Sequence, residues 1–204
     1  MNEFPETSAS LIAGIKDPGN AAAWDTFEKL YRPVIFRVAR AKGMQYADAA
    51  DLVQQVLFAL SKAIDSYQYT PDGPPFRNWL SRITRNAILK TLTRKPKDQA
   101  GGGTGAIEAL ARIPTDENDN SVLIDRELRR EIFAQASEKV RLSVKPLTWL
   151  VFEMSVLQQK TVESVAEALG ISAGNVYAAR SRVMKRLREA VYQLEFDCDQ
   201  KPEL

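Results

Sequence analysis

The sequence predicts an all-α protein built from two small helical domains. Three observations favour this fold class. Apolar residues recur at three- and four-residue steps along most of the chain, as they do on the buried face of a helix. No run shows the sustained two-residue alternation of a half-buried strand. Clusters of Gly, Pro and short polar residues separate the helical segments, and 204 residues are enough for two small domains.

Four helices are expected in the first half of the chain. Asp17-Pro18-Gly19 ends the first helix, Gly43 ends the second, and Pro33 predicts an interruption or kink within the second. Proline and glycine clusters between Tyr69 and Pro75 separate the third helix from the fourth. The expected ranges are 8–15, 21–41, 48–67 and 76–93, and the third helix buries Leu52, Val53, Val56, Leu57, Leu60 and Ile64.

A change in composition after the fourth helix predicts a linker. Residues 101–105 are almost all glycine, and residues 116–120 are polar without apolar anchors. Helices are expected again at 121–141, 145–157, 161–169 and 173–194. The predicted organisation is therefore a first domain at 8–97, a linker at 98–129, a second domain at 130–194 and an acidic tail at 195–204.

The composition argues against several classes of protein. The chain has no histidine and one cysteine, Cys198, so neither a structural zinc site nor a catalytic triad or Cys-His pair can form. We therefore expect no catalytic residue, no metal and no cofactor. The N-terminus lacks the basic start of a signal peptide, and no apolar run is long enough to span a bilayer, which predicts a cytoplasmic protein.

The segment from Thr161 to Leu187 has the pattern of a helix-turn-helix. Thr161 can cap a short helix, Gly170 can adopt the left-handed backbone of a sharp turn, and Ser172 can cap the helix that follows. That second helix places Val176, Ala179, Val183, Leu187 and Val191 on one face. Between Ala173 and Tyr192 it carries five basic residues and one acid, a charge of 5 − 1 = +4 suited to phosphates.

A second basic helix, at Phe76–Lys97, carries seven basic residues and no acid. Its expected buried stripe consists of Phe76, Leu80, Ile83 and Ala87, with Trp79 at the boundary of the exposed side. Tyr67 and Tyr69 precede it. Cations beside exposed aromatic rings suit single-stranded nucleic acid, because the cations hold phosphates and the rings stack on bases.

These motifs, in this order, resemble the sigma-70 family of RNA polymerase sigma factors, in particular the extracytoplasmic-function (ECF) group. The resemblance covers about residues 8–97 and 130–194 and rests on Asp51-Leu52-Val53-Gln54-Gln55-Val56, on Phe76–Asn86, on Val165–Ile171 and on Arg186-Leu187-Arg188-Glu189. It implies a two-domain, non-enzymatic transcription-initiation factor, in which regions 2 and 4 are joined by a flexible linker.

The resemblance also implies site residues and partners. Core polymerase would contact Asp51, Leu52, Gln54, Gln55 and Phe58, of which all but Leu52 would face the clamp of the β′ subunit. The β subunit is a further expected partner. The −10 promoter element would contact Tyr67, Tyr69, Arg77, Trp79, Arg82, Arg85 and Asn86. The −35 element would contact Tyr177, Ala178, Arg180, Ser181, Arg182 and Lys185. Members of the group are often held by an anti-sigma factor. Occlusion of the basic faces by the linker and tail of this chain is an alternative that the sequence leaves open.

Two departures from the family pattern stand out. Ala179 occupies a position where an arginine is usual, with Arg180 one place later, and Gln159 replaces the usual Gly before the helix-turn-helix. Two other hypotheses remain open. A helix-turn-helix regulator acting without polymerase would explain Thr161–Leu194 but not the basic-aromatic helix. A carboxylate nuclease has the least support, because Asp48, Asp51 and the acids at 116–119 have no spacing that assembles a site.

Overall fold

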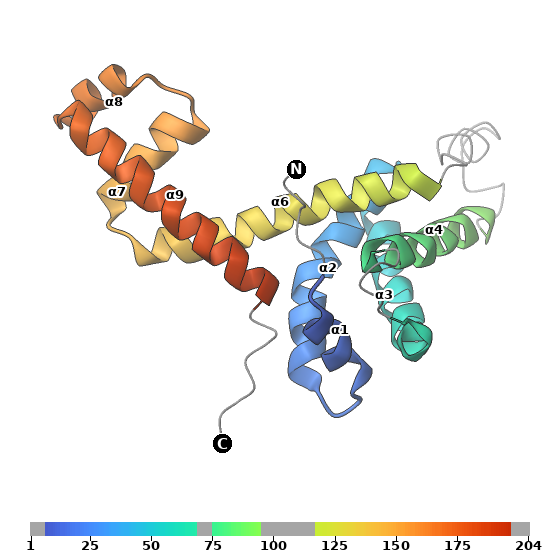
Figure 1. The fold of residues 1–204 in the computed structure, drawn as a ribbon. Coiled ribbons are helices and arrows are strands. Elements are labelled where there is room, and N and C mark those ends of the chain that lie inside the picture. The colour runs from blue at the N-terminus through green and yellow to red at the C-terminus, as the bar shows by residue number, and fades with distance from the viewer. Residues whose placement is uncertain (1–6, 69–74, 95–116, 197–204) are drawn as a thin grey trace, which may run out of the picture. The chain divides into compact units, whose positions relative to one another are not determined.

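The computed structural model describes residues 7–68, 75–94 and 117–196, and all regular secondary structure in these ranges is helical (Figure 1). This confirms the predicted all-α fold class. The described residues divide into two compact units, the first ending at Glu131 and the second beginning at Ile132.

Unit 1 contains the four helices expected from the first half of the sequence. They are α1 (Ala9–Lys16), α2 (Ala21–Ala41), α3 (Tyr46–Ala63), which a 3₁₀ turn η1 (Ile64–Ser66) extends, and α4 (Phe76–Arg94). The interruption predicted at Pro33 does not occur, because α2 is helical on both sides of it. Val34, Ile35 and Val38 are fully buried directly after Pro33, so packing holds this part of the helix in place.

An aromatic cluster forms the centre of unit 1. Phe27 and Tyr31 on α2 are both fully buried and stack with their ring centroids 4.5 Å apart. Phe76, the first residue of α4, packs edge-on against Phe27 at 5.9 Å and against Tyr67 at 5.3 Å. Burial also raises the pKa of Tyr31 far above its ordinary value, and the Tyr31 hydroxyl pairs with that of Thr7. Large aromatic surfaces buried together contribute strongly to core stability.

A fifth long helix, α6 (Glu117–Ser143), begins four residues before the helix predicted there and contributes to both units. In unit 1 its residues Ile124 and Leu128 are buried, and Arg37 on α2 forms ion pairs with Glu127 at 2.8 Å and Glu131 at 3.0 Å. Residues 117–129 of the predicted linker are therefore helical, with Asn120, Ile124, Glu127 and Leu128 buried, while 98–116 lie outside the described residues. The sequence did not reveal this, because the packing depends on tertiary ion pairs.

Unit 2 is made of the rest of α6, α7 (Pro146–Phe152), a π-helical turn η2 (Glu153–Leu157), α8 (Val162–Leu169) and α9 (Ala173–Phe196). Two apolar clusters hold these elements together. One lies between α6, α7 and the second half of α9, with members Ala136, Val140, Phe152, Val183, Leu187 and Ala190. The other fixes α8 against the start of α9, with members Val151, Val162, Val165, Val176 and Ala179.

Candidate nucleic-acid interface

The turn between α8 and α9 has the local geometry of a helix-turn-helix. The Thr161 hydroxyl accepts a hydrogen bond from the Ser164 amide at 3.2 Å, and the Ser172 hydroxyl accepts one from the Asn175 amide at 3.2 Å. Between these caps, Gly170 has the left-handed backbone conformation (φ 62°, ψ 35°). A Cβ at Gly170 would meet no atom within 4 Å, so the position favours glycine for its backbone angles alone.

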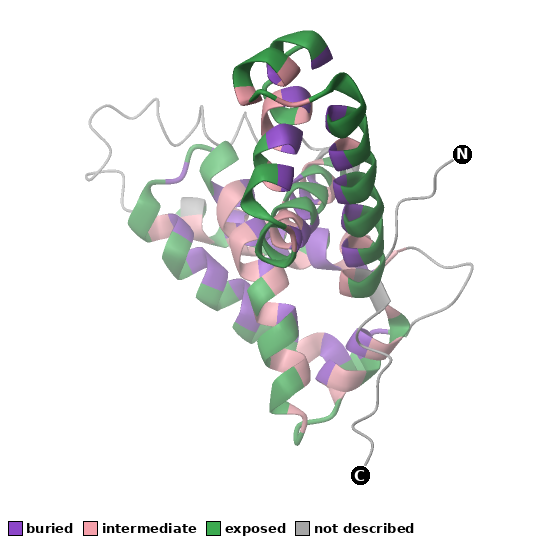
Figure 2. Cartoon of the chain, turned by 90° about the vertical axis from the view of Figure 1, so that its left-hand side faces the viewer, coloured by how far each residue is buried: buried purple, intermediate pink, exposed green. Residues whose placement is uncertain are grey.

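The second helix of this motif, α9, has one buried and one exposed side, which Figure 2 shows along its length. Val176, Val183 and Leu187 are buried as the sequence predicts, while Val191 is only half-buried. The buried side anchors α9 on α7 and α8, so the opposite side is presented to solvent over several turns. This is the arrangement that lets a recognition helix enter the major groove.

The residues predicted to contact the −35 element lie together on or beside the exposed side of α9. Five of them are exposed: Tyr177, Ala178, Ser181, Arg182 and Lys185. The sixth, Arg180, is half-buried. Lys185 lies 4.0 Å from Glu189 one turn later, a weak surface ion pair that leaves the cation accessible. The surface therefore combines an exposed aromatic ring with cations and a hydroxyl.

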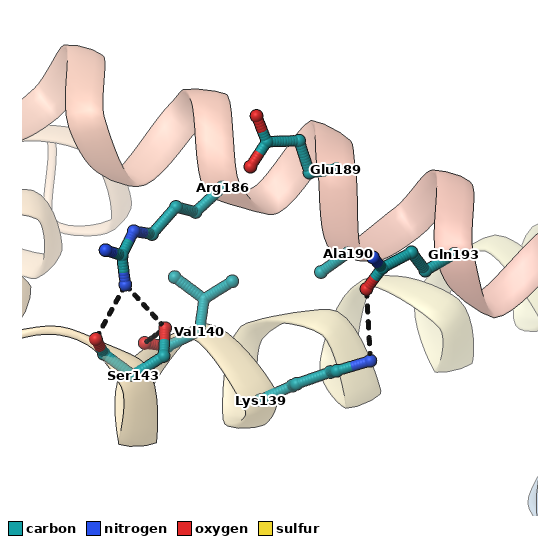
Figure 3. Close-up of a pocket in the computed structure, with 7 residues that line it drawn as sticks. All are labelled: Lys139, Val140, Ser143, Arg186, Glu189, Ala190 and Gln193. Carbon is teal, nitrogen blue, oxygen red and sulfur yellow. Dashed lines mark hydrogen bonds between the residues drawn. The ribbon is translucent and has the colours of Figure 1, made fainter.

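Arg186 has a different place from its basic neighbours on α9. It lines a groove of about 320 Å³ between α6 and α9, and its Nη1 donates hydrogen bonds to Ser143 at the end of α6 (Figure 3). On the same groove Lys139 Nζ donates to Gln193 Oε1 at 3.3 Å. The remaining lining residues are Val140, Glu189 and Ala190. Arg186 thus serves the packing of unit 2, a role that its position in a basic run did not reveal.

The approach to the helix-turn-helix contains an unusual stretch of backbone. η2 is a π-helical turn, in which the Gln158 amide donates to the Glu153 carbonyl at 2.9 Å. Gln159 follows it with φ 55°, the only positive φ of a non-glycine residue in the described ranges. This conformation favours glycine, and a larger side chain at the position carries strain.

Helix α4 divides its predicted −10 residues between two sides. Arg82 and Asn86 are exposed, Trp79 is partly exposed, and Arg77 and Arg85 are half-buried on the other side. The buried stripe is also rotated from the prediction. Phe76 and Leu80 are buried as expected, but Ile83 and Ala87 are only half-buried, and the positions buried in their place are Ser81, Thr84 and Ile88. The buried side is rotated because two polar residues, Ser81 and Thr84, are packed in the interior, although sequence periodicity assigns them to solvent.

Trp79 belongs to an aromatic group at the start of α4. Its ring lies 5.1 Å from that of Tyr67 and 5.5 Å from that of Phe76. Tyr67, predicted to contact DNA, is itself buried, and its carbonyl accepts a hydrogen bond from Lys16 Nζ at 2.5 Å. Tyr69 lies outside the described residues. Of the aromatic residues described in this group, Trp79 is therefore the one with surface to offer to a base.

The exposed side of α3 carries most of the residues predicted to contact polymerase. Asp51, Gln54, Gln55 and Phe58 are all exposed, and Lys62 Nζ lies 4.3 Å from the centre of the Phe58 ring. Leu52 differs from the prediction. It is fully buried in unit 1, because the apolar stripe of α3 turns it toward α2 and α4, so its side chain is not available to a partner.

Sequence reasoning missed one polar network on this side of unit 1. Arg32 on α2 pairs with Glu28 one turn earlier. With the Gln54 amide oriented so that its oxygen faces Arg32, this oxygen accepts hydrogen bonds from Nη1 at 2.8 Å and from Nη2 at 3.2 Å. Arg32 therefore fixes the side chain of Gln54. The only sequence signal was the i,i+4 spacing of Glu28 and Arg32.

Two other kinds of feature, a metal site and a membrane span, concern the described ranges. Within them, no group of three or more acidic or cysteine side chains is placed to hold a metal ion. In the same ranges, no helix has both the length and the apolar character needed to cross a membrane.

Comparison with known proteins agrees with the geometry. The family described as Sigma-70 region 2 matches residues 29–97, which include α3 and α4. The ECF RNA polymerase sigma factor SigE of Mycolicibacterium smegmatis is 24% identical over 189 residues, which cover 90% of this chain and 67% of SigE. Residues 29–97 thus carry the sigma-70 region 2 of this family, and the chain is similar over most of its length to an extracytoplasmic-function sigma factor.

Proposed function

We propose that this sigma factor directs transcription initiation by binding core RNA polymerase, recognising the −35 and −10 promoter elements and melting the −10 DNA. The observation that carries the proposal is the exposed side of α4. There a partly exposed Trp79 lies on the same helix as the exposed Arg82 and Asn86, in a chain that also has a helix-turn-helix. The family is not a class of enzymes, so the chain acts through binding energy alone.

Recognition of the −35 element is assigned to α9. Its exposed cations, including Arg182 and Lys185, can neutralise phosphates and so position the helix in the major groove. Tyr177 and Ser181 supply groups that can address base edges from the same surface. The half-buried Arg180 has the least freedom to reach DNA among the residues of this set.

Melting of the −10 element is assigned to α4. Unstacking a base costs a few kcal/mol, so a protein that opens duplex DNA must supply a replacement surface for the exposed base. The ring of Trp79 can stack on such a base, because it is held by Tyr67 and Phe76 on one side and is partly open on the other. Arg82 and Asn86 then hold the adjacent backbone and base edges.

Core polymerase binding is assigned to the exposed side of α3. Asp51 and Gln55 provide acceptors for a basic surface of the β′ subunit, and Phe58 provides an apolar anchor. Gln54, whose amide oxygen is bonded to Arg32, has its amide nitrogen to offer as a donor. The β subunit is a further expected partner, as the family resemblance implies. Since core polymerase is cytoplasmic, we place the protein in the cytoplasm, with an anti-sigma factor as a regulatory partner.

Run-off transcription tests this function. Purified core polymerase is supplied with pooled genomic promoter fragments, with and without the protein, and core binding is measured in parallel. We expect new start sites that depend on the protein. The absence of both new start sites and core binding would contradict the proposal, and a dimeric footprint on a palindrome without polymerase would favour an ordinary helix-turn-helix regulator.

A further inference from the structure

The first half of α6 lies against the helix to which −10 binding is assigned. Asp125 on α6 places its Oδ1 3.1 Å from Nε of Arg77 on α4, and both side chains are about one-fifth exposed. Arg77 is one of the residues for which the sequence predicts contact with −10 DNA. A carboxylate of the chain itself therefore forms an ion pair with an arginine that nucleic acid would otherwise contact.

Two further anchors hold this half of α6 on unit 1. Ile124 and Leu128 are buried there, and the Arg37 guanidinium bonds to the carboxylates of Glu127 and Glu131 and to the Glu127 carbonyl at 3.1 Å. The segment thus has an apolar stripe and an acidic side. Asp125 faces Arg77, and Glu127 and Glu131 share Arg37, so carboxylates of α6 meet cations of unit 1 as phosphates would. Asp125 and Glu127 also pair with Arg129 and Arg126 of α6 itself.

The polar part of this contact is incompletely matched. Arg77 Nη1 and Asp125 Oδ1 are buried without a hydrogen-bond partner, although the two side chains are at ion-pair distance. Thr84 Oγ1 and Arg85 Nε, two turns further along the same side of α4, are also buried and unpartnered. Both side-chain atoms of the buried Asn120 on α6 are unpartnered as well. Buried donors and acceptors without partners weaken a packed contact.

We propose that residues 117–131 of α6 are a removable cover on α4, which withholds Arg77 and Arg85 from nucleic acid until the cover is released. The proposal rests on the proposed function, because it concerns the same −10 surface. With the cover in place, only the side of α4 that carries Trp79, Arg82 and Asn86 is open. Release leaves Arg77 and Arg85 with donors that fit the phosphate oxygens of a single strand.

The test uses the full chain with Ile124→Asp, which places a charge at a fully buried position of the cover. The matched control is Val122→Asp, which makes the same change of charge on the same helix at a position that is 64% exposed. By charge alone both substitutions weaken binding to DNA. If the cover exists, Ile124→Asp should instead tighten binding to DNA, because undocking of α6 exposes cations on α4, whereas Val122→Asp should still weaken it.

The probe is a labelled pool of random single-stranded oligonucleotides of about 20 nucleotides, titrated by fluorescence anisotropy at several salt concentrations. We expect Ile124→Asp to bind the oligonucleotides about tenfold more tightly than Val122→Asp. This factor applies if the covered surface is open about one-tenth of the time in Val122→Asp and permanently open in Ile124→Asp. The plot of log K against log salt should steepen by about 1.4, or about 0.7 for each cation released. Hydrogen exchange should show lost protection at 117–131 and unchanged protection in α8.

A second pair of variants guards against unfolding of unit 1 by the buried aspartate. Asp125→Asn removes the charge that faces Arg77, and Glu138→Gln removes an exposed charge from the part of α6 in unit 2. Asp125→Asn should tighten binding more than Glu138→Gln. Equal affinities within both pairs would overturn the cover. Run-off transcription with the wild-type protein separates this result from failure of the proposed function. If the proposed function is wrong, the wild-type protein neither supports transcription nor binds core polymerase.

Discussion

Arg186 on α9 donates from Nη1 to the Ser143 carbonyl at 2.6 Å and to the Ser143 hydroxyl at 3.1 Å. The carbonyls of the last helical turn have no partner within the helix, and a nearby cation stabilises them. One of the five basic residues of α9 is therefore used to end α6 and to hold the two helices together. The basic run is thus not a uniform DNA-binding surface.

This contact predicts a division between Arg186 and its neighbour Arg182. Arg186→Gln should lower the free energy of unfolding of unit 2 by about 1 kcal/mol, because the hydrogen bonds are charge-assisted but partly solvated. Arg182→Gln should leave stability unchanged and reduce the salt dependence of promoter-duplex binding by about one ion. Thermal unfolding and salt titrations of both variants check this. A smaller salt dependence for Arg186→Gln would contradict the assignment.

Trp79→Ala should separate promoter opening from polymerase binding. Loss of the ring removes a stacking surface worth about 1–3 kcal/mol, so open complexes should fall about 5- to 150-fold while core binding stays constant. Permanganate footprinting of melted thymines measures opening, and co-sedimentation with core polymerase measures binding. Loss of core binding as well would show that Trp79 only supports the packing of Tyr67 and Phe76.

The exposed Phe58 and the buried Leu52 should give opposite results on the same helix. Phe58→Ala should weaken core binding by about 2 kcal/mol and leave stability unchanged, because 62% of the residue is already exposed. Leu52→Ala should lower the free energy of unfolding by about 2–5 kcal/mol through the cavity it leaves. Chemical denaturation and a core-binding titration distinguish them. A binding defect confined to the folded Leu52 variant would show that this residue does reach polymerase.

The positive φ of Gln159 predicts that a smaller residue stabilises the chain. Gln159→Gly should raise the free energy of unfolding by up to about 1 kcal/mol, because glycine relieves the left-handed conformation. Gly170→Ala is the converse change at φ 62°, and it should cost about 1 kcal/mol without any steric clash. Denaturation midpoints of both variants test the pair. Equal and small shifts would mean that the backbone relaxes at both positions.

Tyr31 makes the stability of unit 1 sensitive to alkaline pH. Burial raises the pKa of its hydroxyl in the folded state, whereas the unfolded chain loses this proton near pH 10. The contribution of Tyr31 is therefore fully present below about pH 10 and is lost above it, by about 1.4 kcal/mol per pH unit. Tyr31→Phe removes this titrating group, so the difference in free energy of unfolding between the two proteins should change above pH 10. A difference that stays constant across this pH range would contradict the raised pKa of Tyr31.

Local signals predicted most of the fold. The caps at Thr161 and Ser172 and the turn at Gly170 need only neighbouring atoms, and they form as the sequence indicates. The bounds of the helices in unit 1 follow in the same way from proline and glycine positions. Pro33 was misjudged, because helix-breaking tendency is local, whereas the burial of Val34 and Ile35 that overrides it is tertiary.

The candidate site was less predictable where it depends on pairs distant in sequence. Arg77 and Asp125 are 48 residues apart, and only folding brings them to 3.1 Å. The rotation of the buried side of α4, which encloses Thr84, depends on tertiary packing and does not follow from periodicity within α4. A charged residue amid an apolar stripe, such as Arg37 between Val34 and Val38, is the signal that could have indicated a partner helix.

The π-helical turn η2 has a consequence for chain length. A π turn closes its hydrogen bonds over five residues where an α-helix needs four, so this stretch holds one residue in excess. Removing that residue returns η2 to α-helical bonding and keeps the Thr161 cap in place. The same deletion inside α8 rotates the remaining side chains by about 100° and turns Val165 away from α9. Length variation among relatives should therefore collect at η2, next to the helix-turn-helix but outside it.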